Sequence, residues 1–141
     1  MKIKPLMTRH NGDSDTSTLL TNEFFPTPEF EHLSEWVRLG VSLVRKNDAC
    51  ADEHRQILRA RGETEKRLSE LDRWRQSFAF TDREKAALNL SQSISLHEPE
   101  ELSTLILKAA RRHFSTHQIV RLTLAIIAVN DWIDLHEIRV A

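Results

Sequence analysis

The feature that most constrains this sequence is a set of helix-start signals, each followed by apolar residues at helical spacing. Thr81 and Glu84 form a capping box, in which the hydroxyl and the carboxylate each bond a backbone N–H of the first turn. Ser115 and Gln118 form a second capping box. The 141 residues include only 3 Gly and 4 Pro, which disfavours a turn-rich β fold. An all-α fold is therefore predicted.

These signals divide the chain into about six helices. Thr27 followed by Pro28 begins the first helix, because Pro is favoured at the first helical position. Asn47 or Asp48 caps the second helix, and Gly62 supplies the left-handed residue that ends it. The expected helices cover approximately residues 28–46, 48–61, 64–75, 82–95 and 99–113, and a last long helix begins at the second capping box.

The chain before the first helix has a different composition. Residues 8–18 are polar and lack periodic apolar positions, so they cannot bury enough surface to offset the entropy of ordering. We therefore divide the chain into a polar, partly mobile N-terminal arm, residues 1–26, and one helical domain, residues 27–141.

The last expected helix bears on assembly. Between Ile119 and Leu135 its apolar residues lie nearly all around the helix axis. A helix that is apolar on every side must be buried on every side, and in so small a domain part of it would meet another subunit. We expect an obligate homo-oligomer. The three tryptophans, Trp36, Trp74 and Trp132, fall within apolar stripes and are expected in the core.

Composition excludes several classes of function. Lys and Arg number 20 against 21 Asp and Glu, which argues against a nucleic-acid partner. No segment reaches the roughly 18 apolar residues of a membrane span, and the opening residues lack the apolar run of a signal peptide, so a cytoplasmic location is expected. The sequence contains no glycine-rich phosphate-binding loop, and we expect no cofactor. His113 and His117 are four residues apart, but the second capping box separates them onto different helices and no third ligand is evident, so no metal is expected.

The single cysteine, Cys50, lies four residues before His54, a spacing that places both on one helix face. The helix N-terminus and the nearby Arg45 and Lys46 would favour a reactive thiolate. A lone cysteine on an amphipathic helix is also often a small buried apolar residue. The carboxylates at Asp48, Asp52 and Glu53 oppose the thiolate, so the sign of the net pKa shift stays open.

The region from Glu35 to Trp132 resembles the AhpD-like alkylhydroperoxidase branch of the carboxymuconolactone decarboxylase family. The family pattern is a Glu, eleven residues, Cys-x-x-Cys, three residues and a His. This chain has Glu35, then Asn47-Asp48-Ala49-Cys50, then His54, with every spacing kept. Further similar segments are residues 61–65, 71–75, 80–88, 113–115, 122–125 and 130–132.

The resemblance implies an all-α, AhpD-like helical bundle that forms a homo-oligomer, a trimer or a hexamer. In the family, the His and the Glu form a proton relay that activates two thiols, one of which attacks a peroxide while the other resolves the product. Carried over, Cys50 matches the second cysteine, His54 the base and Glu35 the carboxylate. Asn47 replaces the first cysteine, so the implied chemistry is that of a one-Cys, peroxiredoxin-type antioxidant acting on a small hydroperoxide with an external thiol reductant.

Two alternatives follow from the same residues. The missing first cysteine favours a catalytically silent family member that acts as an oligomeric scaffold or small-molecule-binding protein. A lactone decarboxylase-type step with His54 as acid and base is a third reading. Two further departures from the family pattern are Arg45-Lys46, where Asn-Gly is usual, and Ile133-Asp134, where Asn-Arg is usual.

Overall fold

The structure is a computed structural model, and it describes residues 26–140. The arm expected over residues 1–26 lies outside this range except for its last residue. The described residues form helices and contain no strand, as predicted. The elements are α3 (Pro28–Val44), α4 (Asp48–Ala60), α5 (Glu65–Glu70), the 3-10 helix η1 (Leu71–Arg73), α6 (Asp82–Ser95), α7 (Glu100–Ala110) and α8 (Thr116–Val140).

The predicted capping signals are confirmed. Thr81 Oγ1 accepts from the backbone N–H of Glu84 at 3.1 Å, and the Glu84 carboxylate accepts from the N–H of Thr81 at 2.8 Å. Ser115 and Gln118 make the same reciprocal pair at 3.1 and 3.0 Å. Thr27 Oγ1 accepts from an N–H in the first turn of α3 at 3.1 Å. Each pair satisfies helix-start donors that have no partner within the helix, which explains why these elements begin where they do.

Helix α8, the last long helix expected after the second capping box, runs from Thr116 to Val140. The last residues, from His136 on, include neither Gly nor Pro, so nothing in the sequence stops the helix there.

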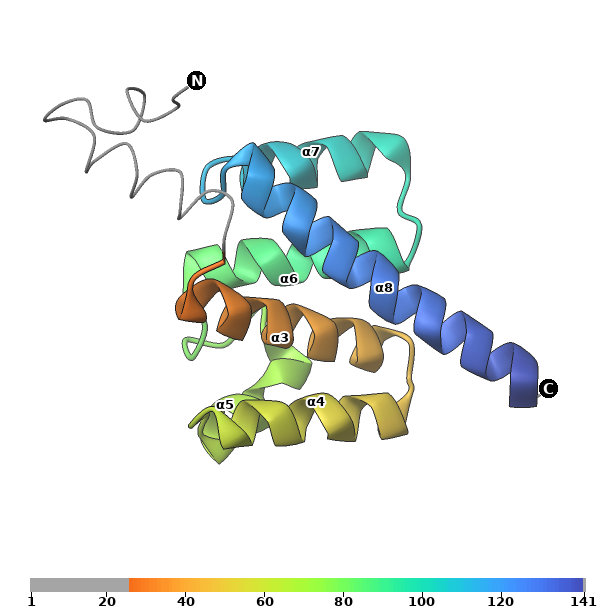
Figure 1. The fold of residues 1–141 in the computed structure, drawn as a ribbon. Helices are drawn as coiled ribbons and strands as arrows, with labels where there is room; N and C mark the ends of the chain where they lie inside the picture. The colour runs from red at the N-terminus through yellow and green to blue at the C-terminus, as the bar shows by residue number, and fades with distance from the viewer. Residues whose placement is uncertain (1–25, 141) are drawn as a thin grey trace, which may run out of the picture.

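Helix α3 is the central element of the domain. It packs against α4, α6 and α8, and α6 packs in turn against α7 and α8. Figure 1 shows α3 between α4 on one side and α6 on the other, with α8 running diagonally across the bundle and beyond it at its C-terminal end. Residues on α3 therefore face neighbours in several directions, which sets the position of the polar residues described below.

Two apolar clusters fill the space around α3. One joins it to α6, α7 and α8, and the other joins it to α4, α5 and the segment before α6. Trp36 is fully buried in the second cluster, and its ring meets that of Phe80 edge-on at a centroid distance of 5.1 Å. Burial of each large apolar side chain contributes about 1.5–3 kcal/mol, so these clusters fix the mutual positions of the helices.

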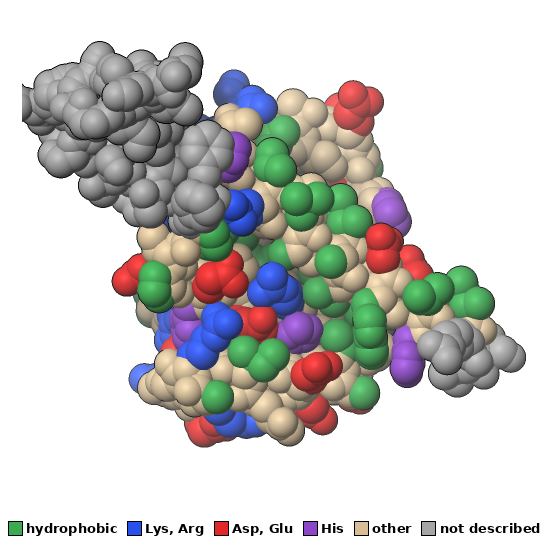
Figure 2. All heavy atoms as spheres, viewed as in Figure 1, with side chains coloured by type: hydrophobic (Ala, Val, Ile, Leu, Met, Phe, Trp, Pro, Cys, Tyr) green, Lys and Arg blue, Asp and Glu red, His purple; other side chains and the backbone are tan. Residues whose placement is uncertain are grey.

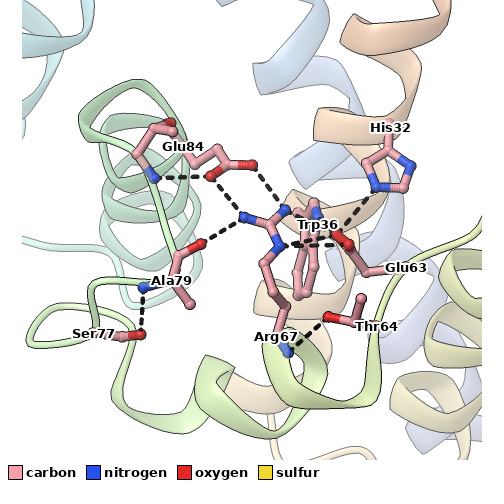
Figure 3. Close-up of polar contacts among 9 residues, drawn as sticks. His32, Trp36, Glu63, Thr64, Arg67, Ser77, Ala79 and Glu84 are labelled. Atoms are coloured by element: carbon pink, nitrogen blue, oxygen red, sulfur yellow. Dashed lines mark hydrogen bonds and ion pairs between the residues drawn. The ribbon is translucent and has the colours of Figure 1, made fainter.

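A charged network also ties α3 to α5 and α6 (Figure 3). The Arg67 guanidinium bonds both oxygens of Glu84 at 3.0 Å and reaches Glu63 at 2.8 Å. It lies 5.0 Å from the ring centroids of both Trp36 and Phe80. The indole N–H of Trp36 donates to Glu63 at 3.2 Å. Because Trp36 is thus held on two sides, the rotation of α3 about its own axis is fixed one residue from Glu35.

The expectation for Trp132 was wrong. Its side chain is 47% exposed and stacks on His136 with ring centroids 4.7 Å apart, whereas Trp36 is buried and Trp74 is half-buried. Ile133, one residue further, takes the core position, and a step of one residue turns the side chain about 100° around the helix. The apolar residues of α8 therefore form a buried stripe and a separate exposed one.

Candidate active site

Two facing helices bring five polar residues together. Glu35, Arg38 and Ser42 are spaced three and four residues apart, so they lie on one face of α3. Helix α4, which packs against α3, contributes Cys50 and His54 from its first two turns. Glu35 and Ser42 are buried polar residues, with 5% and 0% of their surface exposed. The three residues singled out from the sequence, Glu35, Cys50 and His54, are thus neighbours at one helix–helix contact.

The carboxylate of Glu35 is used on both oxygens. Its Oε2 lies 2.8 Å from Nδ1 of His54, and its Oε1 accepts from the Arg38 guanidinium at 3.0 Å. Burial alone would raise the pKa of Glu35, but the hydrogen bonds and charges of His54 and Arg38 outweigh it and hold that pKa below its usual value. Glu35 is therefore an ionised carboxylate, which only accepts hydrogen bonds.

The ionised Glu35 determines which nitrogen of His54 carries the proton. Because a carboxylate cannot donate, Nδ1 of His54 must be the donor in the 2.8 Å contact. The second nitrogen, Nε2, then has an unshared pair in the neutral ring, and it makes no hydrogen bond to any described residue. A Glu-backed imidazole with an available Nε2 is the arrangement of a general base.

Cys50 is 4% exposed, and its hydrogen-bond partner among the described residues is Ser42, whose Oγ lies 3.0 Å from Sγ. His54 shares the helix face but bonds to Glu35 and not to the thiol. Burial raises the pKa of Cys50, the hydrogen bond from Ser42 lowers it, and the charges of Glu53 and Glu35 raise it. The net effect is to raise the pKa of Cys50, a direction that the sequence had left open, and this favours the neutral thiol.

Asn47, at the position of the first cysteine in the family pattern, caps α4. Its Oδ1 accepts from the backbone N–H of Cys50 at 3.0 Å. This residue therefore has a structural role that satisfies a helix-start donor, and its amide cannot form a disulfide with Cys50.

Arg38 and Ser42 were not recognised from the sequence. Their spacing of three and seven residues from Glu35 was the available signal, since it places them on the same helical face. That signal gains meaning only from the packing of α3 on α4, which shows that the shared face meets the cysteine.

Two departures from the family pattern contact each other. Arg45 follows α3 and forms an ion pair with Asp134 on α8, and its guanidinium also donates to Oδ1 of Asn130 at 2.8 Å. Arg45 and Asp134, which both depart from the family pattern, thus form one ion pair that links the end of α3 to α8.

Several negative findings concern the described part of the chain. No group of three or more His, Cys, Asp or Glu residues there could hold a metal ion. His113 lies in the turn after α7 and His117 in the first turn of α8, so they occupy different elements, as expected. Among residues 26–140, none of the helices combines the length and the apolar character needed to cross a membrane.

A cavity of about 830 Å³ lies at the N-terminal ends of α3 and α6. Leu33, His32, Arg61 and Arg83 are among its lining residues, and Glu35, Cys50 and His54 are not. The candidate active site is therefore separate from this cavity.

Comparison with known structures agrees with the helical fold. A solved structure from Agrobacterium tumefaciens, of a protein of unknown function proposed to be the antioxidant defence protein AhpD, superposes with a TM-score of 0.65. It is 24% identical, and the match covers 86% of this chain and 84% of that one. The class defined by this fold is the AhpD-like helical bundle.

The family follows from two sequence matches. The model of the carboxymuconolactone decarboxylase family matches residues 31–93, a range that includes Glu35, Cys50 and His54. The uncharacterized protein YdfG of Bacillus subtilis (strain 168) is 33% identical over 98 residues, which are 70% of this chain and 67% of that protein. The chain belongs to the carboxymuconolactone decarboxylase family, as its resemblance indicated.

Proposed function

We propose that this chain is an AhpD-like, thiol-dependent hydroperoxide reductase, a peroxiredoxin-type antioxidant that uses the single thiol of Cys50. The observation that carries the proposal is the 2.8 Å pair of Glu35 and His54, on the same helix contact as Cys50. A purely structural cysteine does not require a carboxylate-backed imidazole one helical turn away.

In the proposed reaction Cys50 begins as a thiol, in keeping with its raised pKa. Nε2 of His54 takes the thiol proton, and Glu35 stabilises the imidazolium that results. The sulfur then attacks the terminal oxygen of the hydroperoxide, so that an S–O bond forms and the O–O bond breaks. The alkoxide that leaves takes the proton from His54 and departs as an alcohol. The peroxide is reduced, and Cys50 is oxidised to a sulfenic acid.

Regeneration requires an external thiol, because Asn47 stands where a resolving cysteine would be. One reductant thiol attacks the sulfenic acid, forms a mixed disulfide with Cys50 and releases water. A second thiol attacks the reductant sulfur of that disulfide, which returns Cys50 to the thiol and releases an oxidised disulfide. A cytoplasmic location would supply such thiols.

The experiment is turnover of cumene hydroperoxide with excess dithiothreitol as reductant. The wild type is compared with Cys50→Ser, with Asn47→Cys and with His113→Asn, whose histidine lies in the turn after α7, on a different element. We expect activity in the wild type and in His113→Asn, and loss of activity in Cys50→Ser. Turnover that is equal in the wild type and in Cys50→Ser would contradict the proposal.

A catalytically silent member of the family is the second candidate function. The 4% exposure of Cys50 and the capping role of Asn47 favour it, and the 830 Å³ cavity is of a size that holds small molecules. Activity that appears only in Asn47→Cys would identify the wild type as a silent scaffold or small-molecule-binding protein.

We also propose that the chain forms a homo-oligomer, a trimer or a hexamer. Figure 2 shows apolar side chains along the length of α8 on the exposed face of the chain. A second copy of this face would bury them, since contiguous exposed apolar surface marks interaction sites. Light scattering should give a multiple of the 16.4 kDa chain, and a monomeric mass at micromolar concentration would contradict the proposal. The exposed residues of this face are Val120, Leu124, Ile127, Trp132, Leu135 and Ile138.

A further inference from the structure

The hydroxyl of Ser42 has two acceptors and only one proton. The side chain is fully buried on α3, and its Oγ lies 3.0 Å from the backbone oxygen of Arg38 and 3.0 Å from Sγ of Cys50. A serine hydroxyl donates one hydrogen bond at a time and can accept others. The two contacts therefore describe two arrangements, and the charge of the sulfur decides between them.

When Cys50 is a thiol, the S–H group can donate to Ser42 Oγ, and the Ser42 hydroxyl donates to the Arg38 carbonyl. When Cys50 has lost its proton, the sulfur is only an acceptor, and the Ser42 hydroxyl can turn to it. The Arg38 carbonyl still accepts a hydrogen bond from the backbone N–H of Ser42, because both residues lie within α3. Rotation of one hydroxyl thus supplies a donor to the sulfur without leaving a buried carbonyl unpaired.

We propose that Ser42 is a catalytic residue of this site, whose hydroxyl turns from the Arg38 carbonyl to Cys50 and holds the negative charge on the sulfur. This inference rests on the proposed function, since it concerns the step in which Cys50 loses its proton. Ser42 touches the reacting sulfur directly.

The electrostatic surroundings show why such a donor matters. Burial and the charges of Glu53 and Glu35 raise the pKa of Cys50, and the hydrogen bond from Ser42 acts in the opposite direction. Arg38 is committed to Glu35 at 3.0 Å, and His54 is bonded to the same carboxylate. Among the described residues, the Ser42 hydroxyl is the donor within hydrogen-bond distance of the sulfur.

The composition of the chain permits a direct test. The chain has one cysteine and no tyrosine, so the ultraviolet absorbance of a thiolate can be followed to alkaline pH without interference from tyrosinate. The wild type, Ser42→Ala and Ser91→Ala would be titrated in the absence of peroxide. Ser91 is the matched control, because it is 1% exposed and its hydroxyl also bonds an α3 carbonyl, that of Val37 at 3.4 Å.

We expect the thiolate fraction at a fixed pH below the midpoint to fall about tenfold in Ser42→Ala, the effect of one charge-assisted hydrogen bond. Ser91→Ala should titrate like the wild type. If Ser42→Ala does not fold, Ser42→Thr and Ser42→Val provide a matched pair of equal shape, in which only the threonine retains the hydroxyl. Identical titrations of the hydroxyl-containing and hydroxyl-free variants would overturn the inference.

This titration and the turnover assay can fail separately. A wild type that does not reduce cumene hydroperoxide but loses thiolate in Ser42→Ala would contradict the proposed function and leave the role of Ser42 at the sulfur in place. If the wild type reduces cumene hydroperoxide but Ser42→Ala titrates like the wild type, only the role of Ser42 is contradicted.

Discussion

The domain contains two charged networks, both joined to α3, and they differ in which polar groups they leave without a hydrogen-bond partner. In the network around Arg67, the guanidinium is bonded to Glu63, to Glu84 and to the backbone oxygen of Ala79 at 2.7 Å. Its Cζ atom also lies 5.0 Å from the ring centroids of Trp36 and Phe80. In the network around Glu35, each carboxylate oxygen has a hydrogen-bond partner, but Nε2 of His54 makes no hydrogen bond to a described residue.

This difference separates a structural network from a site of chemistry. The pKa of Arg67 is raised far above its usual value, because its hydrogen bonds and ion pairs with Glu84 and Glu63 outweigh the opposing effect of burial. A guanidinium so committed cannot exchange a proton and serves to hold α3, α5 and α6 together. The Glu35 network instead ends on the imidazole of His54, whose Nε2 can accept a proton. The thiol of Cys50 lies at the same helix contact, and the proposed reaction uses both groups.

The largest expected effect comes from removing the centre of the structural network. Arg67→Ala leaves Glu63 and Glu84 without their cation in a partly buried place, and we expect it to lower the free energy of unfolding by about 3 kcal/mol. Arg59→Ala is the control, because its ion pair with Glu65 is exposed to solvent and its loss should change the free energy of unfolding much less. Urea unfolding measures both, and equal losses would remove the distinction between the two pairs.

The corresponding change in the other network should affect activity more than stability. His54→Gln removes the proposed base, and we expect hydroperoxide turnover to fall about a hundredfold. The free energy of unfolding should fall less than in Arg67→Ala, because Arg38 still neutralises Glu35. A loss of stability as large as that of Arg67→Ala, with turnover retained, would make the Glu35 network structural as well.

Asn47 tests the frame that holds the site. Asn47→Ala removes the cap of α4 and should cost about 1 kcal/mol of unfolding free energy. Asn47→Asp keeps an acceptor at the cap and should retain most of that stability. Thermal unfolding of the two variants measures the difference, which should vanish if the 3.0 Å contact with the Cys50 N–H contributes nothing.

Lys46 precedes this cap with a φ of 56°, a left-handed conformation that favours glycine. Lys46→Gly should therefore raise the free energy of unfolding by about 0.5–1 kcal/mol. Lys46→Ala, which keeps a Cβ atom, should not produce this gain. Chemical unfolding distinguishes them, and an equal response of the two variants would show that the strain at this residue is negligible.

The smallest effect is expected at alkaline pH. Because burial raises the pKa of Cys50 in the folded chain, the unfolded chain loses the thiol proton first as the pH rises. The thiol therefore contributes stability that is present below about pH 8.5 and is lost as the pH rises through its folded-state pKa. Over this pH range the free energy of unfolding should fall more in the wild type than in Cys50→Ala. Urea unfolding at several pH values measures both, and parallel curves would contradict the raised pKa.

Much of the fold could be predicted from the sequence because the signals are local. A capping box such as Thr81 with Glu84 acts within one turn, so its outcome does not depend on distant residues. The exposure of Trp132 could not be predicted, because a helix with apolar residues all around its axis gives no indication of which of them face the core.

For the site, the sequence by itself determined that Glu35, Cys50 and His54 keep the family spacing and that Asn47 replaces the first cysteine. Only the tertiary structure decided that Arg38 and Ser42 face the same contact, and that burial and carboxylates favour the thiol at Cys50. The physical reason is that spacing along a helix sets which residues share a face, whereas a pKa depends on burial and on charges brought together by packing. The same packing of α4 on α3 that buries the cysteine also gives it a hydroxyl partner.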